Sequence, residues 1–121
     1  MPSAHQVIFC IVNAGFSDAV MDAAKKYGAR GGTVIRARGT AGGDSERRYK
    51  ITVSPEKEIV MILVNVRITD DILHAIYREV GLETDGQGIA FAVPVDQVVG
   101  LHHSHGSDLQ PDADGEEEER T

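Results

Sequence analysis

The sequence predicts an α+β domain in which a strand–helix–strand unit occurs twice. Segments rich in β-branched residues alternate with segments of helical periodicity along residues 5–101. The two predicted helices also begin alike, because SDAVMDA at 17–23 matches TDDILHA at 69–75 in its hydroxyl residue, its acidic residue and its apolar positions. A doubled unit of this kind is the split β-α-β, or ferredoxin-like, arrangement. The expected fold is a βαββαβ sandwich with an antiparallel sheet and two helices on one face.

The first strand and helix follow from local signals. HQVIFCIVN at 5–13 is apolar and β-branched, as expected of a buried strand. Ser17 is expected to cap the following helix, and Gly28 is expected to stop it. The residues at helical spacing on one face are Val20, Ala23, Ala24 and Tyr27.

The middle of the chain predicts two strands around a loop. GTVIRARG at 32–39 reads as the second strand, and EIVMILVNV at 58–66 reads as the third. Between them, TAGGDSERRYK at 40–50 is polar and rich in glycine, which predicts a flexible loop.

The second half repeats the first. Thr69 is expected to cap a helix that Gly81 ends, with one face formed by Ile72, Ala75, Ile76 and Glu79. IAFAVPV at 89–95 is the predicted fourth strand, and QVVGL at 97–101 could add a short edge strand.

The first and third strands are apolar at nearly every position, which indicates burial of both faces. Two helices cover only one face of a four-stranded sheet. The bare face is therefore expected to meet other copies of the chain, so the sequence predicts a homo-oligomer.

Composition limits the classes of protein. The single cysteine, Cys10, lies in an apolar run and is expected to be a buried thiol without a disulfide partner. The chain has no long apolar segment or signal-peptide pattern, which favours a cytoplasmic protein. It also lacks a basic face with interleaved aromatic residues, so nucleic-acid binding is not expected.

The acidic residues gather at the C-terminus. Residues 107–121 hold seven acidic residues and one arginine, and therefore most of the net charge of −7. With Leu109 as its only large apolar residue, this segment is expected to be a disordered tail after a domain spanning residues 1–106.

The glycines of KKYGARGGTVIRARGTAGGD at 25–44 admit two interpretations. Glycine lets backbone amides approach a phosphate, and it also permits the positive φ angles of ordinary turns. The segment GLETDGQG at 81–88 admits the same two interpretations, because it lacks the lysine that would identify a P-loop. The residues alone favour turns. No catalytic constellation is evident, so an enzyme is not predicted.

The order of elements resembles the P-II signal-transduction family, in a divergent branch, over about residues 5–101. The most specific motifs are Gly31-Gly32-Thr33-Val34 and Gly86-x-Gly88 followed by a strand ending in Pro94-Val95. The resemblance implies a ferredoxin-like homotrimer that binds ATP or ADP in clefts between subunits. It also implies that a protruding loop reports the bound state to a transporter or an enzyme.

The resemblance places the nucleotide cleft on particular residues. It falls on Thr33, on Gly39 at the base of the loop 40–50, and on the glycine loop of Gly86, Gln87 and Gly88. Met61 and Leu63 occupy the positions that line the base pocket.

Three positive charges of the family are missing here. Ile89 stands where the phosphate-binding lysine is expected, and Gly100 and His102 stand at the positions of two arginines. Arg36 and Arg38, together with Arg47, Arg48 and Lys50, could supply charge from the loop side. The alternative is a ligand that carries fewer phosphates than ATP.

The sequence therefore predicts a P-II-like regulator that senses an adenine nucleotide of the ATP, ADP or AMP type, without a tightly bound cofactor. Its partner is expected to be a membrane transporter or an enzyme, contacted through residues 40–50. The alternative is a metal-binding trimer of the same fold that uses His102, His103 and His105.

Overall fold

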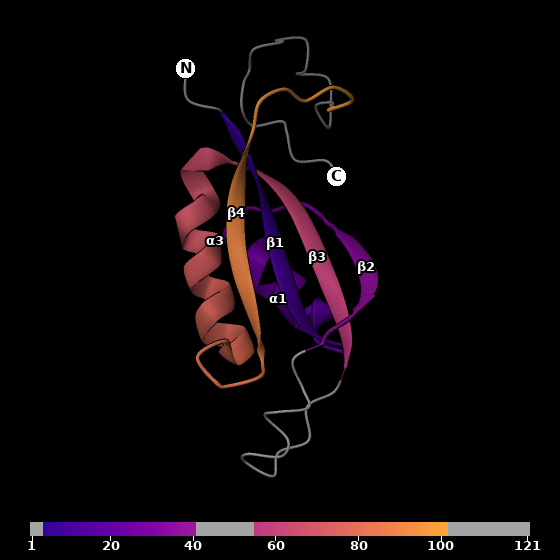
Figure 1. The fold of residues 1–121 in the computed structure, drawn as a ribbon. Helices are drawn as coiled ribbons and strands as arrows, with labels where there is room; N and C mark the ends of the chain where they lie inside the picture. Colours follow the sequence, from indigo (N-terminus) through magenta and orange to yellow (C-terminus); the bar gives the residue numbers. More distant parts are fainter. Residues whose placement is uncertain (1–3, 41–54, 102–121) are drawn as a thin grey trace.

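The computed structural model describes residues 4–40 and 55–101 (Figure 1). Its elements follow the predicted order: β1 (His5–Asn13), α1 (Ser17–Lys25), β2 (Thr33–Arg38), β3 (Glu56–Asn65), the 3-10 turn η1 (Val66–Ile68), α3 (Thr69–Ile76), the π turn η2 (Tyr77–Gly81) and β4 (Gly88–Val95). Most of the predicted loop 40–50, the C-terminal histidines and the acidic tail lie outside the described residues.

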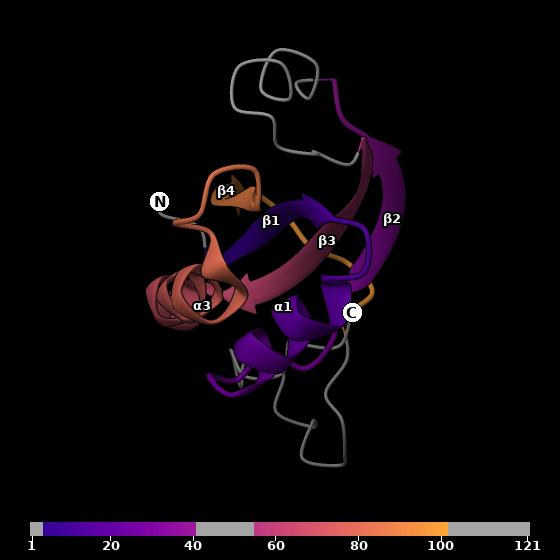
Figure 2. The same ribbon diagram turned by 90° about the horizontal axis from the view of Figure 1, so that it is seen from below.

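The four strands form one antiparallel sheet in the order β2-β3-β1-β4. Both helices lie on the same side of this sheet (Figure 2). The sheet order, the antiparallel pairing and the one-sided helix layer confirm the ferredoxin-like prediction. None of the helices in the described part is long and apolar enough to cross a membrane.

The core lies between the helices and one face of the sheet. Cys10 of β1 pairs with Val60 of β3 on one side and with Ala90 of β4 on the other. In the middle of β1 and β3, every second residue faces the helices and is at most 1% exposed: Ile8, Cys10 and Val12 on β1, and Val60, Ile62 and Val64 on β3. The fully buried side chains are Ile8, Cys10, Val12, Val20, Ala23, Ala24, Val60, Ile62, Val64, Ile72, Ala75 and Ile76. Burial raises the pKa of the Cys10 thiol to about 12, as fits a structural residue.

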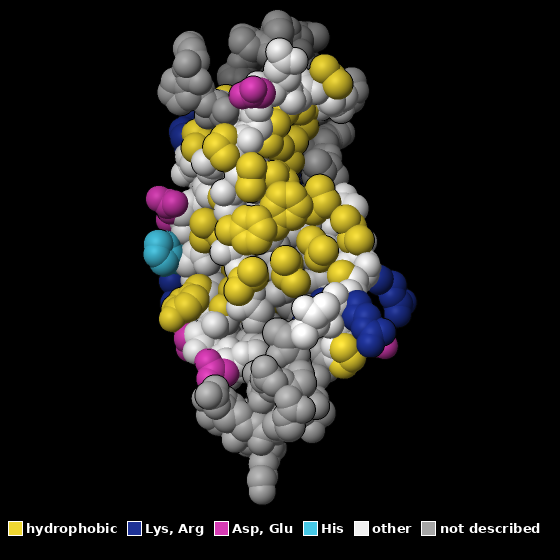
Figure 3. All heavy atoms as spheres, in the orientation of Figure 1, with side chains coloured by type: hydrophobic (Ala, Val, Ile, Leu, Met, Phe, Trp, Pro, Cys, Tyr) yellow, Lys and Arg dark blue, Asp and Glu magenta, His cyan; other side chains and the backbone are white. Residues whose placement is uncertain are grey.

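The opposite face of the sheet has no helix over it and is also apolar (Figure 3). We call it the open face; its apolar residues are Val7, Phe9 and Ile11 of β1, Ile35 of β2, Ile59, Met61 and Leu63 of β3, and Ile89, Phe91 and Val93 of β4. Phe9 and Phe91 stack with their ring centroids 5.5 Å apart. Phe91 is still 41% exposed, and Ile89 is 57% exposed. An apolar surface of this extent on one face is typical of an interface.

Both predicted helix caps are wrong. Ser17 and Thr69 are the first helical residues, and Phe16 and Ile68 occupy the cap positions without a side-chain cap bond. Thr69 is buried instead, and its hydroxyl oxygen has no hydrogen-bond partner among the described residues. Tertiary packing has overridden the local cap preference at both sites.

The ends of the second half also differ from the prediction. The α-helix stops at Ile76, and the chain continues to Gly81 as a π turn in which Leu82 N–H donates to the Tyr77 carbonyl at 3.1 Å. Residues 97–101 do not form the suggested edge strand. β4 therefore keeps an unpaired edge within the described sheet.

Candidate functional site

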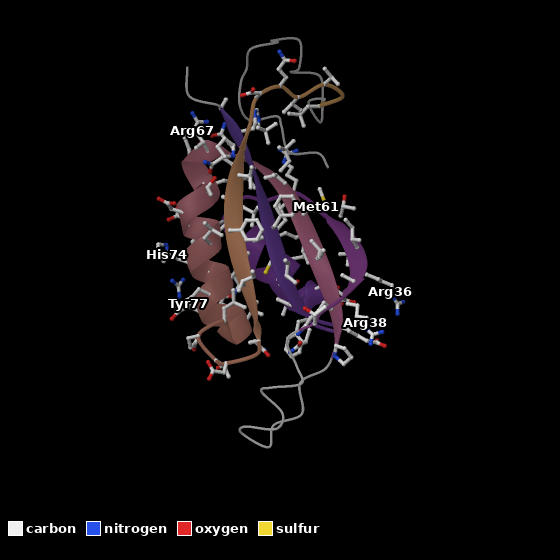
Figure 4. The ribbon with its side chains drawn as sticks, in the orientation of Figure 1. Arg36, Arg38, Met61, Arg67, His74 and Tyr77 are labelled. Carbon is white, nitrogen blue, oxygen red and sulfur yellow. The ribbon has the colours of Figure 1, made fainter. Side chains whose placement is uncertain are left out.

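The predicted site residues fall into two groups in the fold. Arg36, Arg38, Gly39 and the glycine loop at 86–88 lie at the end of the sheet from which residues 41–54 depart (Figure 4). Thr33, Met61 and Leu63 lie farther along the sheet, toward its other end.

Two segments come together where the chain leaves β2 and returns to β3, namely residues 36–39 and 55–58; we call this part of the domain the neck. Gly39 N–H donates to the Pro55 carbonyl at 2.6 Å, and Ala14 N–H donates to the Glu56 carbonyl at 3.0 Å. A cavity of about 420 Å³ lies at this neck, lined by Ala14, residues 36–38 and residues 55–58. These hydrogen bonds hold the residues on either side of 41–54 at the end of the sheet.

The charges at the neck are divided between the two faces of the sheet. Register places Arg36 opposite Glu58 and Arg38 opposite Glu56 on the helix-bearing face. Ala37 pairs with Lys57, so these two residues lie on the open face. Arg36 and Arg38 are exposed along the β2 edge (Figure 4).

The glycine loop requires glycine at two of its positions. Gly86 has φ +82° and Gly88 has φ +145°, and a Cβ at Gly88 would collide with the Ile11 carbonyl. Asn13 fixes the loop by donating through its Nδ2 to the Gly86 carbonyl at 3.1 Å and to Gln87 Oε1 at 3.4 Å. Gln87 in turn donates to the Val80 carbonyl at 3.3 Å.

Lys57 is a site residue that the sequence prediction missed. Its Nζ donates to Asn13 Oδ1 at 2.6 Å, so Asn13 joins Lys57 to the glycine loop. The Lys57 stem crosses over Gly39, where an added Cβ would stand 2.8 Å from Lys57 Cε. No local pattern could have found this cluster, because strand register brings together residues 44 positions apart.

Thr33, Met61 and Leu63 form the second group. Thr33 pairs directly with Met61, and Gly32 makes room for the Met61 carbonyl, which a Cβ there would approach to 2.9 Å. Met61 pairs with Phe9, whereas Gly88 pairs with Val12. Three residues of strand separate these pairs by about 10 Å along the sheet. Thus the second group and the glycine loop do not meet in one chain.

Glu58 organises the turn beside the neck. Its Oε1 accepts from Gly15 N–H at 3.1 Å and from Ser17 N–H at 3.2 Å. The hydrogen bond from Gly15, followed by one from the Ser17 side chain, lowers the pKa of this carboxyl below its usual range. Glu58 therefore stays ionised beside Arg36 and caps α1 from a neighbouring strand.

The comparisons with known proteins identify the family. The family model for nitrogen regulatory protein P-II matches residues 5–105. The chain belongs to the P-II family. A crystal structure of Arabidopsis thaliana PII bound to citrate superposes with a TM-score of 0.58 at 23% sequence identity, over 78% of this chain and 79% of that one. At this identity the likeness concerns the fold. The chain matches no curated protein by sequence.

This P-II chain carries no charge at the position that follows the glycine loop. Ile89 is exposed there and lines a groove of about 550 Å³ between β4 and α3. The groove also contains Tyr77 and His74, whose Nδ1 lies 2.9 Å from the Asp70 carbonyl and fits a donor to it (Figure 4). Its lining is mainly apolar and includes the carboxylate of Asp70 but, among the described residues, no lysine or arginine, whereas Arg36, Arg38 and Lys57 line the cavity at the neck.

The metal alternative finds no support in the described part of the P-II domain. No group of three or more His, Cys, Asp or Glu side chains is placed to hold a metal ion within residues 4–40 and 55–101. His102, His103 and His105, on which that alternative depends, lie outside these residues.

Proposed function

We propose that this P-II protein senses an adenine nucleotide in clefts between the subunits of a homotrimer. The bound state would be passed to a partner through residues 40–50, and a membrane transporter is the first candidate. P-II proteins are regulatory signalling proteins, and that role follows from family membership. The ligand, the trimer and the partner are the proposed parts.

The observation that carries the proposal is the polar cluster at the neck. The Asn13 amide nitrogen donates a hydrogen bond to the glycine loop, and its amide oxygen accepts one from Lys57. Arg36 and Arg38 lie on the other face of the same end of the sheet, where they line the neck cavity together with Lys57. Glycines that admit a phosphate to the backbone, with cations nearby, suit a nucleotide's polyphosphate. The cluster also adjoins both ends of the segment expected to signal.

The separation of the two site groups supports a cleft between subunits. One chain presents Thr33, Met61 and Leu63 at a distance from its own glycine loop. The apolar open face gives the chain a surface for self-association. A trimer in which one subunit supplies the glycine loop and the next supplies Thr33, Met61 and Leu63 would bring the groups together.

Isothermal titration of ATP, ADP and AMP into the wild type tests the nucleotide assignment, and Arg38→Ala tests the neck. We expect micromolar or tighter binding of at least one nucleotide. Arg38→Ala should weaken it tenfold or more, because a charge-assisted hydrogen bond contributes about 1.5–3 kcal/mol.

Arg67→Ala is the matched control, since Arg67 is exposed at the opposite end of the domain (Figure 4). Wild-type protein that binds none of the three nucleotides would overturn the proposed function. Equal binding by wild type and Arg38→Ala would remove only the role of Arg38.

A further inference from the structure

We infer that Lys57 is the side chain that recognises the phosphate group of the ligand, and that Asn13 and Gly39 hold it in place for that purpose. This inference rests on the proposed function and adds to it a binding residue and a positioning pair. It starts from the hydrogen bond between Lys57 Nζ and Asn13 Oδ1 at 2.6 Å.

Lys57 is placed where a phosphate on the glycine loop would need a cation. Asn13 contacts both Lys57 and Gly86, so one amide group separates the ammonium from the loop backbone. The residue next to the loop, Ile89, cannot supply charge. Arg36 and Arg38 point to the other face of the sheet, opposite Glu58 and Glu56. Among the described cations, Lys57 is thus the one joined to the glycine loop by a hydrogen-bonded network, through Asn13.

The Lys57 ammonium has bonding capacity left for a ligand. An ammonium group has three N–H donors, and Asn13 takes one of them. Among the described residues, Asn13 is the hydrogen-bond partner that the structure gives to Lys57 Nζ. A half-buried ammonium bound only by an amide oxygen gains strongly from an anionic partner.

The stem of Lys57 is held as well as its head. It runs across Gly39, where the lack of a side chain leaves room for it, and a Cβ would stand 2.8 Å from its Cε and 3.4 Å from its Cγ. Gly39 N–H is meanwhile bound to the Pro55 carbonyl. Gly39 therefore lets the lysine cross the neck of the loop, which gives this glycine a role besides backbone freedom.

The same network links the ligand to the signalling segment. Lys57 lies two residues after Pro55, whose carbonyl closes the neck. A phosphate that draws the ammonium away from Asn13 would weaken the hydrogen bond between Lys57 of β3 and Asn13 at the end of β1. This hydrogen bond lies close in sequence to residues 41–54. Ligand binding and the neck are thereby coupled through one side chain.

The test compares ATP with adenosine, because only ATP carries phosphate. Lys57→Met removes the charge and keeps the length of the stem. Lys25→Met is the matched control, since Lys25 is an exposed lysine at the far end of α1, about 12 Å along the helix from Ser17. We expect Lys57→Met to weaken ATP binding at least tenfold and to change adenosine binding less than twofold. Lys25→Met should leave both unchanged.

A double-variant cycle tests the positioning role of Gly39. Gly39→Ala keeps every charge and displaces the lysine stem, so it should weaken ATP binding by itself. In the Lys57→Met background the same change should add little, because the group that it displaces is already gone. Additive losses would show that Gly39 acts on the ligand directly and would overturn its role in holding Lys57.

Titration with inorganic pyrophosphate separates this inference from the proposed function. If the wild type binds pyrophosphate but no nucleotide, and Lys57→Met loses that binding, the inference stands and the proposed function fails. If the wild type binds ATP and Lys57→Met keeps the same ATP-to-adenosine ratio of affinities, the inference is overturned and the function stands. Binding of neither probe by the wild type contradicts both.

Discussion

Glu58 shows how a single side chain replaces a local signal with a tertiary one. Ser17 has the residue type of a helix cap, and sequence reasoning assigns it that role. In the structure Ser17 N–H is instead bound to the carboxylate of Glu58, 41 residues later. A negative charge at the start of a helix also interacts favourably with the helix dipole. The cap therefore depends on strand pairing, which no window of sequence around Ser17 contains.

Glu58→Gln should lower stability in a pH-dependent way. The folded protein holds the pKa of Glu58 below its ordinary value of 4.5, so the charged form stabilises the fold above that pH. This contribution disappears as the pH falls through the lowered pKa. Urea midpoints at fixed protein concentration should differ near neutral pH and converge in acid. A difference that is as large in acid as at neutral pH would contradict the electrostatic explanation.

The contact between Lys57 and Asn13 could not be predicted from the residues themselves. The glycines at 86 and 88 are visible in the sequence, and the structure explains both by positive φ angles. Their partners are not visible, because the contact of Lys57 with Asn13 depends on the register between β1 and β3. A shift of one residue would move Lys57 to the helix face.

At the scale of elements, the apolar content of the strands was a sound guide to the architecture. Both faces of β1 and β3 are apolar, as predicted, and helices cover only one of them. The sequence could not assign residues to faces, since continuous apolar runs contain no alternation. The structure makes that assignment: Val60 faces the helices, whereas Phe91 lies on the open face.

Two substitutions to aspartate should therefore have different effects. Val60→Asp places an unpaired carboxylate in the core and should cost at least about 3 kcal/mol of folding stability. Phe91→Asp, at a residue 41% exposed in the single chain, should leave the domain folded and weaken self-association. Circular dichroism and light scattering on both variants distinguish these results. A Val60→Asp protein as stable as the wild type, or a fully assembled Phe91→Asp protein, would contradict the assignment of faces.

The π turn at the end of α3 is an element that periodicity did not predict. The apolar pattern from Ile72 onward suggests one continuous helix to Gly81. Gly81 does end the turn, with φ +85°, but the hydrogen bond from Leu82 to Tyr77 widens it. This widening places the Val80 carbonyl where Gln87 binds it, so the turn helps to position the glycine loop.

At the scale of the whole molecule, the acidic tail is expected to be separate from the domain. Residues 107–121 lie beyond the described residues and contain few apolar side chains. Deleting residues 108–121 should change the melting temperature by less than about 5 °C, equivalent to about 1 kcal/mol for a domain of this size. A larger fall would show that the tail packs against the body.

The complete site exceeds what one chain can show. The fold, the family and the glycine loop follow from the sequence, because each rests on local pattern or motif. Thr33 and Met61 pair with each other but remain apart from Gly88 within the domain. In the proposed function a second copy brings them together, and the open apolar face is the surface proposed to receive it.

Sedimentation velocity of the wild type with ATP, recorded at a wavelength where the nucleotide dominates absorbance, tests the central claim most directly. The proposed function predicts that nucleotide sediments with protein of trimer mass, at about one nucleotide per chain. The same boundary should lose its nucleotide signal in Lys57→Met at equal concentration. A monomeric boundary, or a trimer that carries no nucleotide at saturating ATP, would contradict the proposed sensing of a nucleotide between subunits.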